Sequence, residues 1–188
     1  MHYKIQYGRL TSLLFFIGII FSGCKEEKSF EQYYPTRELL PSCNGLVVRH
    51  TWYSLGYNRQ HKQANWVYYE LKDRGPSVAK RSDRFSVDPK LKQICATPQD
   101  YTKCGYDRGH LCPAADMAFD SIAMRETFYM SNMSPQVPAF NRGIWKRLEE
   151  LFRKRAEKEP LFVVTGPVFK NNKGKIGKNK VTVPGQFY

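Results

Sequence analysis

The apolar and polar positions in the first half of the chain predict a pair of strands followed by a long loop. Residues 46–53 and 64–71 are rich in β-branched and aromatic residues, and a polar segment around residues 56–58 separates them. Two such runs with a turn between them are typical of an antiparallel hairpin. Glycines and prolines interrupt residues 72–103, which we expect to form a loop whose length suggests a functional role.

The clearest helix predicted by the pattern covers residues 141–157. Its apolar residues recur at helical spacing, with lysines and arginines between them: Ile144, Trp145, Leu148, Leu151 and Phe152. Asn141, Glu149 and Arg153 are separated by multiples of four, so they form one stripe that drifts slowly around the helix axis. We therefore expect these three side chains to border one site.

Two later segments predict further strands. Residues 161–165 form an apolar run that is typical of a buried strand, and residues 181–188 have the composition of another. At 188 residues the chain is long enough for one domain with a hydrophobic core. We expect that domain at residues 44–188, after a polar tether at residues 24–43.

The N-terminal segment is predicted to be a secretory signal. Its apolar run at residues 13–21 is too short to span a bilayer comfortably, and a basic start precedes it. The run ends in Ser-Gly-Cys at residues 22–24, which resembles a bacterial lipobox with Cys24 as the lipidated residue. Residues 1–23 would then be the signal peptide. Phe21 departs from the usual leucine, which leaves an uncleaved anchor as the alternative.

The charge of the chain favours an anionic partner. Lysine and arginine number 30 against 17 acidic residues, a net charge of +13. Lys4 and Arg9 are the only charged residues before Cys24, so the remainder carries 28 minus 17, or +11. Such an excess speeds capture of nucleic acid or of an anionic membrane surface. The alternative is a basic protein that charge merely keeps soluble.

The cysteines suggest disulfides rather than a metal site. Beyond Cys24 the chain has four cysteines: Cys43, Cys95, Cys104 and Cys112. An even number in an exported domain suggests up to two disulfides, with three pairings left open. Two of these cysteines flank residues 107–110, where a disulfide could brace the loop, although plain structural stapling would explain such disulfides as well. A zinc site is disfavoured because no Cys-x-x-Cys pair occurs.

Two motifs carry the chemistry that the sequence predicts. Residues 106–111 read YDRGHL, and residues 141–149 read NRGIWKRLE. A histidine can take a proton from water near neutral pH, an asparagine oxygen suits a hard cation, and arginines donate to phosphate. The two motifs together predict a metal-assisted phosphodiesterase site.

These motifs resemble those of the DNA/RNA non-specific endonucleases, the ββα-metal or His-Me finger nucleases with a DRGH motif. Residues 131–136 also resemble the Asn-x-x-Pro-Gln segment of that family, and the resemblance runs from Leu46 to the end. It implies an α+β fold with an antiparallel sheet and a ββα-metal centre. It also implies hydrolysis of DNA and RNA to 5′-phosphates with Mg²⁺, or Mn²⁺ in its place. Family members usually continue beyond this length, so the chain is either a short member or a fragment.

The resemblance assigns the central chemistry to three residues. His110 would be the general base that deprotonates water, although a lone histidine is more often structural. Asn141 would be the direct Mg²⁺ ligand, whereas an asparagine at the start of a helix is also a favoured N-cap. Glu149 would hold a metal-bound water, and its alternative is an i,i+4 ion pair with Arg153.

Several arginines are expected to face phosphate. Arg153 and Arg81 resemble the family arginines that offset charge on the reacting phosphate, and such donors are a main electrostatic contribution in phosphoryl transfer. Arg84 competes with Arg81 for this role, and either could be a solvated surface residue. Asp107 and Arg108 are expected to shape a turn and screen the site, with Arg108 and Arg84 as substrate contacts.

Four further residues have supporting or structural expectations. Gly109 is expected to permit close approach of the backbone. Asn132 resembles a residue that orients the loop facing His110. His50 and His61 fall in the expected hairpin without such context, so we interpret them as structural.

Two rival functions remain open. One is a catalytically silent surface lipoprotein that binds nucleic acid, and the other is a structural envelope lipoprotein. The presence of His110, Asn141 and Glu149 together argues against the binder, which does not need all three, and a structural lipoprotein would leave the motifs unexplained. The sequence therefore favours an Mg²⁺-dependent nuclease, held by lipid in the bacterial cell envelope on the periplasmic or surface side of the outer membrane.

Overall fold

The computed structural model describes residues 40–42 and 45–188 of the chain, and all of them belong to one compact unit. The expected signal peptide at residues 1–23, the lipidation site Cys24 and all but three residues of the expected tether lie outside the described residues. Among the described residues, none of the helices has the length and apolar character needed to cross a bilayer.

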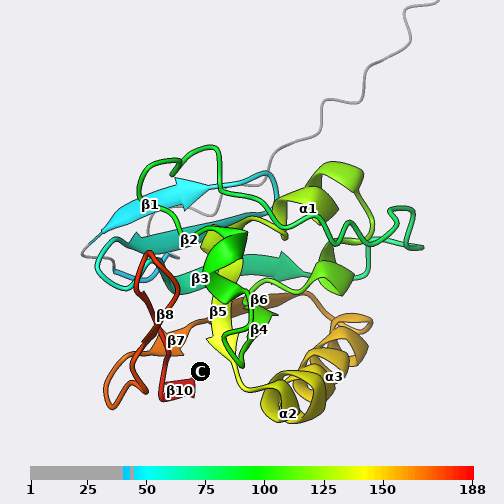
Figure 1. Cartoon of the computed structure of the whole chain (residues 1–188). Coiled ribbons are helices and arrows are strands. Elements are labelled where there is room, and N and C mark those ends of the chain that lie inside the picture. The colour runs from blue at the N-terminus through cyan, green and yellow to red at the C-terminus, as the bar shows by residue number, and fades with distance from the viewer. Residues whose placement is uncertain (1–39, 43–44) are drawn as a thin grey trace, which may run out of the picture. The chain divides into compact units, whose positions relative to one another are not determined.

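The centre of the fold is a four-stranded antiparallel sheet with the order β1-β2-β3-β6. Its strands are β1 (Leu46–Arg49), β2 (Tyr53–Asn58), β3 (Gln63–Leu71) and β6 (Leu161–Thr165). The register pairs Leu55 with Val67, and every neighbouring pair runs antiparallel. The predicted hairpin is therefore confirmed, and the sheet forms a layer on one side of β4 (Asp107–His110), β5 (Met133–Gln136) and α3 (Lys146–Ala156) (Figure 1).

The hairpin turn differs from the prediction in position. Residues 56–58 lie within β2, and the chain reverses at residues 59–62. The Asn58 side chain closes this turn by accepting from the backbone N–H of Gln60 at 2.9 Å and of His61 at 3.1 Å. The expected strand at residues 46–53 is also divided. The chain bends after β1, and His50 turns inward to a buried site.

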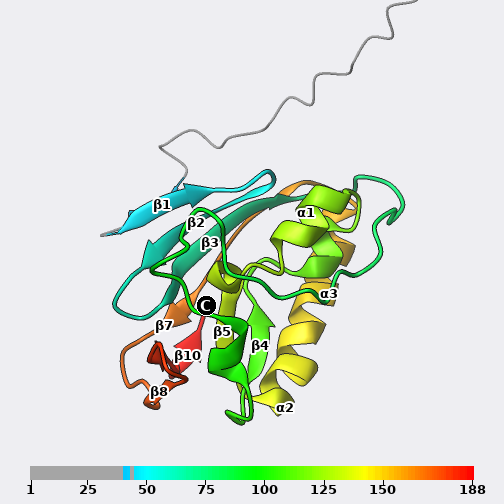
Figure 2. The same ribbon diagram turned by 45° about the horizontal axis from the view of Figure 1, so that its top comes forward.

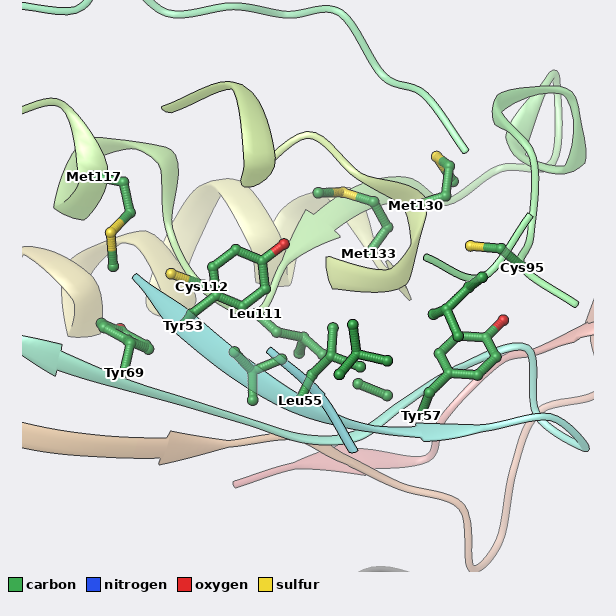
Figure 3. Packing of buried hydrophobic residues seen from close by; sticks show 14 of the residues in the cluster. Tyr53, Leu55, Tyr57, Tyr69, Cys95, Leu111, Cys112, Met117, Met130 and Met133 are labelled. Atoms are coloured by element: carbon green, nitrogen blue, oxygen red, sulfur yellow. The ribbon is translucent and has the colours of Figure 1, made fainter. Parts of the chain in front are cut away.

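One face of the sheet forms the floor of the hydrophobic core. Tyr53, Leu55 and Tyr57 alternate along β2 and are at most 3 % exposed. Figure 3 shows these side chains facing a second set of buried residues from later segments, among them Leu111 and Met133. Burial of apolar area is the main favourable term in folding. The core therefore attaches the segment that carries residues 107–110 to the sheet.

The DRGH residues form a strand rather than the expected turn. Strand β4 (Asp107–His110) pairs antiparallel with β5 (Met133–Gln136), so that Asp107 is opposite Gln136 and His110 is opposite Met133. Strand β5 is fixed to the central sheet by a buried hydrogen bond of 2.6 Å from Ser134 to Gln63.

A helical segment follows these two strands and completes a ββα unit (Figure 1). It consists of α2 (Pro138–Phe140), a π-helical turn η5 (Asn141–Trp145) and α3 (Lys146–Ala156). The helix therefore starts at Pro138, three residues before the prediction, because a proline is well tolerated in the first turn. The π turn coincides with Gly143, whose dihedrals of φ −104° and ψ −105° are not helical.

The remaining elements are short. They are the 3₁₀ turns η2 (Pro98–Tyr101), η3 (Ala114–Met117) and η4 (Met130–Asn132), the helix α1 (Ser121–Glu126), and the strands β7 (Pro167–Val168), β8 (Lys175–Ile176), β9 (Val181–Thr182) and β10 (Gln186–Phe187). The expected strand at residues 181–188 is thus two strands, which pair with β8 and β7 respectively. Strand β6 is buried on one face only, since Phe162 is 56 % exposed.

The expected disulfides are not formed among the cysteines that the structure describes. Cys95, Cys104 and Cys112 are free thiols, and Cys43 lies outside the described residues. Cys95 and Cys112 are buried in the hydrophobic core, where burial raises the pKa of Cys95 to about 11 and that of Cys112 well above its usual value. Both thiols therefore act as small apolar core residues, and the three described cysteines form none of the up to two disulfides that their number suggested.

Candidate active site

His110 lies at the end of β4 against aromatic rings. Its ring meets Phe128 edge-on, with centroids 4.9 Å apart, and Phe85 lies 6.0 Å away. Its Nε2 is buried without a hydrogen-bond partner, whereas Nδ1 is not among the buried atoms that lack a partner. Burial lowers the pKa of His110 to about 3, and the positive charge of Arg81 adds to this shift. The imidazole is therefore neutral at physiological pH.

Asn132 fixes the chain immediately after His110. This fully buried side chain accepts from the backbone N–H of Cys112 at 2.8 Å and donates to the carbonyls of Cys112 and Thr127 at 2.9 Å. The backbone carbonyl of Asn132 also accepts from Leu111 at 3.0 Å. A side chain whose hydrogen-bonding groups are used in this way has one orientation. It braces the segment that a disulfide was expected to brace.

Asn141 and Arg142 share one acceptor on β4. Asn141 Nδ2 donates to Asp107 Oδ2 at 2.9 Å, and Arg142 makes two hydrogen bonds to the same carboxylate at 2.8 and 2.7 Å. These contacts, Arg142 first, hold the pKa of Asp107 below its usual range. Asn141 has helical dihedrals and follows Val137, the residue at the N-cap position, so the N-cap alternative for Asn141 is wrong.

The bond to Asp107 also decides which atom of Asn141 remains available. Because its amide nitrogen is occupied, the amide is oriented with Oδ1 pointing away from Asp107. Within the described part of the chain, Oδ1 makes no hydrogen bond and is not among the buried atoms without a partner. Arg142 was not anticipated as a residue of this site, and only its position beside Asn141 could have indicated it.

Glu149 is a half-buried carboxyl with an altered pKa. Burial raises its pKa to about 7, the negative charge of Asp116 adds to the rise, and Arg153 and Arg81 oppose it. The alternative ion pair between Glu149 and Arg153 is not formed among the described residues. Arg153 Nη1 instead contacts Asp116 Oδ1 at 2.7 Å.

Asp116 explains why Arg153 turns away from Glu149. Its side chain is 1 % exposed, and Tyr69 also donates to it at 3.0 Å. A buried carboxylate without a cation is costly, so the deeper of the two acids takes the arginine. Burial raises the pKa of Asp116, and the bonds from Arg153 and Tyr69 oppose that rise. No sequence motif indicated Asp116, because its importance comes from burial beside residues far along the chain.

Arg81 and Arg84 are both exposed but differ in what they contact. Arg81 pairs with Asp83 at 2.7 Å, and its guanidinium carbon lies 5.1 Å from the Phe128 ring centroid. Burial has the largest effect on the pKa values of His110 and Glu149, and the positive charge of Arg81 lowers both. Arg84 makes no hydrogen bond or ion pair with any described residue. The structure thus brings Arg81, rather than Arg84, to His110.

The other two DRGH residues contact protein groups. Arg108 Nη2 donates to the Pro98 carbonyl at 3.0 Å, and its guanidinium carbon lies 4.9 Å from the Phe85 ring centroid. At Gly109 an added Cβ would lie 2.2 Å from side-chain atoms of Gln136, which is an overlap. Gly109 therefore permits a close approach as expected, although by a side chain rather than by backbone.

The remaining histidines lie in separate structural contacts. His50 Nε2 lies 2.9 Å from Asp88 in a buried pair, and Ser131 donates to the same carboxylate oxygen at 2.6 Å. His61 bonds Thr182 at 3.0 Å. Both histidines make the kind of contact expected of structural residues.

The donor atoms of the site fit a hard divalent cation. No group of three or more His, Cys, Asp or Glu side chains suited to a metal occurs in the described part of the chain. Asn141 offers a free, oriented amide oxygen, and Glu149 offers a carboxyl. Mg²⁺ retains several waters and takes few protein oxygens, so this pair suits it better than zinc.

Comparisons with known proteins identify the family and the fold of this chain. A model of the DNA/RNA non-specific endonuclease family matches residues 40–188. A nuclease from a Nostoc species is 39 % identical over 144 residues, which is 75 % of this chain and 52 % of that protein. Nuclease C1 from Cunninghamella echinulata is 38 % identical over 152 residues, or 72 % of this chain and 60 % of the relative. This chain therefore spans about half the length of the curated relatives it matches.

A solved structure has the same fold. It is a chain in the crystal structure of an EndoG/EndoGI complex, which concerns EndoG inhibition. The TM-score is 0.69 at 31 % identity, covering 75 % of this chain and 64 % of that one. The similarity confirms the expected α+β fold with antiparallel sheets.

Proposed function

This chain belongs to the DNA/RNA non-specific endonuclease family, and we propose that it is a Mg²⁺-dependent endonuclease. It would hydrolyse phosphodiester bonds of DNA and RNA with little sequence preference and leave 5′-phosphates. The observation that carries this proposal is the packing of His110 and Arg81 against one ring: His110 meets Phe128 edge-on with centroids 4.9 Å apart, and the Arg81 guanidinium carbon lies 5.1 Å from the same ring centroid. A base next to a phosphate-binding cation is what attack by water on a phosphodiester requires.

His110 would act on the attacking water. A neutral imidazole accepts a proton at the nitrogen that solvent reaches, a role worth roughly 10²–10⁴ in rate. The aromatic packing of Phe128 and the buried bonds of Asn132 hold the ring and the segment after it. Because the ring is already held in place, the base loses less conformational freedom when the transition state forms.

Asn141 and Glu149 would hold the metal, Asn141 directly and Glu149 through a bound water. When bound, Mg²⁺ supplies positive charge that stabilises the leaving 3′ oxygen. Asp107 contributes by presenting the Asn141 oxygen, and Arg142 contributes by fixing Asp107. The raised pKa of Glu149 means that the carboxyl is partly protonated near neutral pH before a cation arrives.

Two arginines would offset charge that develops on the phosphate. Arg81 is exposed and acts on His110 and Glu149. Arg153 is held by Asp116 through one terminal nitrogen only, so its other donors remain free for phosphate. Positive groups placed before the reaction need no reorganisation when charge appears.

The rival function is a silent nucleic-acid-binding lipoprotein. The same basic surface would serve it, but a binder needs neither a neutral histidine in an aromatic setting nor an oriented asparagine oxygen. For localisation we propose a lipid anchor at Cys24 in the bacterial cell envelope. Its support is the apolar run before residues 22–24, outside the described residues.

The deciding experiment is cleavage of plasmid DNA and of RNA with Mg²⁺ and with EDTA. We expect both polymers to be degraded to 5′-phosphate ends only when Mg²⁺ is present. Binding of both polymers without cleavage at any Mg²⁺ concentration would favour the silent binder and overturn the proposal.

A further inference from the structure

The loop that leaves β3 borders an open groove beside the proposed active site. Residues 78–89 of this loop and part of α1 line a hollow of about 840 Å³. Figure 2 shows the loop running past α1. Pockets of about 300–1,000 Å³ hold drug-sized molecules, so the groove has room for about one to two nucleotides.

Hydrogen bonds at both ends hold the loop against the rest of the protein. The backbone N–H groups of Val78 and Ala79 donate to the Ala118 carbonyl at 2.9 Å. At the other end, Ser86 donates to Phe128 at 3.2 Å and accepts from Met130 at 2.9 Å. The segment between these anchors makes none of the described backbone hydrogen bonds outside regular elements. The anchored ends make the groove a preformed feature of the fold.

The lining of the groove is positively charged. Four basic side chains line it, and all four are exposed: Lys80, Arg81, Arg84 and Arg125. None of its lining residues is acidic. Asp83, which pairs with Arg81, is not among the residues that line it. The charge is therefore unbalanced and attracts a polyanion.

Aromatic contacts connect the groove to His110. Phe85 lines the groove, and its ring centroid lies 6.0 Å from that of His110. Arg81 also lines it and lies over Phe128, the ring that meets His110 edge-on. Tyr129 adds a second aromatic ring to the lining. Cations interleaved with aromatic rings are typical of sites for a single nucleic-acid strand, where rings stack on bases and cations contact phosphates.

We propose that this groove holds the single strand that flanks the cleaved bond, with Arg125 and Lys80 binding phosphates away from the reacting one. The inference rests on the proposed nuclease function and extends it to substrate positioning. Arg125 projects from α1, and Lys80 and Arg84 from the loop, so the strand would pass between the two elements. The contacts are to phosphates, so they would add affinity for longer substrates without sequence preference.

The test measures binding in EDTA, where cleavage does not interfere, using fluorescently labelled single strands of about 12 and about 3 nucleotides. The variants are Arg125→Ala and Lys80→Ala, singly and together. Each phosphate contact contributes about 0.7 to the slope of log affinity against log salt, so each single variant should lower the slope by about 0.7. Lowering the salt from 1 M to 0.1 M strengthens binding of the longer strand by the wild type. Each single variant should gain about fivefold less affinity over this change in salt.

Lys178→Ala is the matched control, because it removes the same charge from an exposed residue in the turn between β8 and β9. It should leave the slope close to that of the wild type, and Arg125→Lys should retain most of the binding. Thermal melts of all variants should coincide, since these side chains are exposed.

The possible outcomes separate the groove from the nuclease function. Equal weakening by Lys178→Ala and Arg125→Ala would assign the effect to net charge and overturn the proposal, as would unchanged binding in both groove variants. If Arg125→Ala and Lys80→Ala lose binding to anionic phospholipid vesicles but still bind the oligonucleotides, the proposal is overturned. The groove would then be a membrane contact. Groove-dependent binding by a wild type that never cleaves would support the groove and reject the nuclease function.

Discussion

Asp107 and Asn141, 34 residues apart, are joined by a hydrogen bond of 2.9 Å from the asparagine amide nitrogen to a carboxylate oxygen. This bond links β4 to the helical segment and leaves the asparagine oxygen free. Arg142 holds the same carboxylate with two further bonds. Asn141 and Arg142 share the Asp107 carboxylate as an acceptor, but only Asn141 has an oxygen that can bind a cation. Substituting each residue in turn therefore separates loss of the metal ligand from loss of the contact to Asp107.

We expect Asn141→Ala to raise the Mg²⁺ concentration needed for half-maximal cleavage, because the direct ligand is lost. Arg142→Ala removes contacts to the same Asp107 carboxylate but keeps the Asn141 oxygen, so it should raise that midpoint by a smaller amount. The measurement is a Mg²⁺ titration of plasmid cleavage beside thermal melts. Identical shifts in both variants would mean that Asn141 acts only through the fold.

His110→Ala should lower cleavage by at least roughly 10²-fold, because it removes the proposed base. Affinity for nucleic acid, measured in EDTA, should change little. His61→Ala is the control, since His61 bonds Thr182 away from the site and should retain activity. Wild-type rates in His110→Ala would sink the assignment of the base.

The raised pKa of Glu149 predicts a pH-dependent stability in the metal-free protein. Its pKa is about 7 in the folded chain, whereas its ordinary value is 4.5. Between pH 4.5 and pH 7 the folded state therefore holds a proton that the unfolded state has released. Stability should therefore fall as pH rises from 4.5 to 7 and change no further above that, with a total of at most about 3 kcal/mol.

Glu149→Gln is the reference for this effect, because the amide cannot ionise. In EDTA, the Tm of the wild type should fall relative to that of Glu149→Gln as the pH rises from about 5 to about 8. A difference that stays constant across this range would contradict a raised pKa at Glu149.

Gly109→Ala should destabilise the protein, because the new Cβ would overlap the Gln136 side chain at 2.2 Å. Overpacking of this kind typically costs about 1–3 kcal/mol. The double variant Gly109→Ala with Gln136→Ala should recover much of the loss, since the overlapping atoms are gone. Urea unfolding of the four combinations measures the coupling, and strictly additive effects would argue against a steric origin.

Cys24 is expected to carry lipid and to direct the mature protein to membranes. Cells that make wild type or Cys24→Ala should differ on fractionation, and only the wild type should incorporate a fatty-acid label. If the two proteins distribute identically and neither takes up label, the lipoprotein interpretation is wrong.

Local patterns were enough to predict several features of this protein. The spacing of Ile144, Trp145 and Leu148 predicted the helix, because helical periodicity is set by residues only three or four apart. The hairpin and the strand at residues 161–165 followed from local composition, whereas the segment at 181–188 is divided into two strands. The short motif at residues 107–110 indicated the chemistry, since the residue types themselves limit what the site can do.

Contacts between distant segments decided the rest. The partner of Arg153 is Asp116 rather than the nearby Glu149, because burial made the more distant acid the stronger competitor. Core packing left Cys95 and Cys112 as free thiols where the cysteine count suggested disulfides. Such outcomes depend on which side chains lose water together, and that is settled only when segments far apart in the chain have packed against one another.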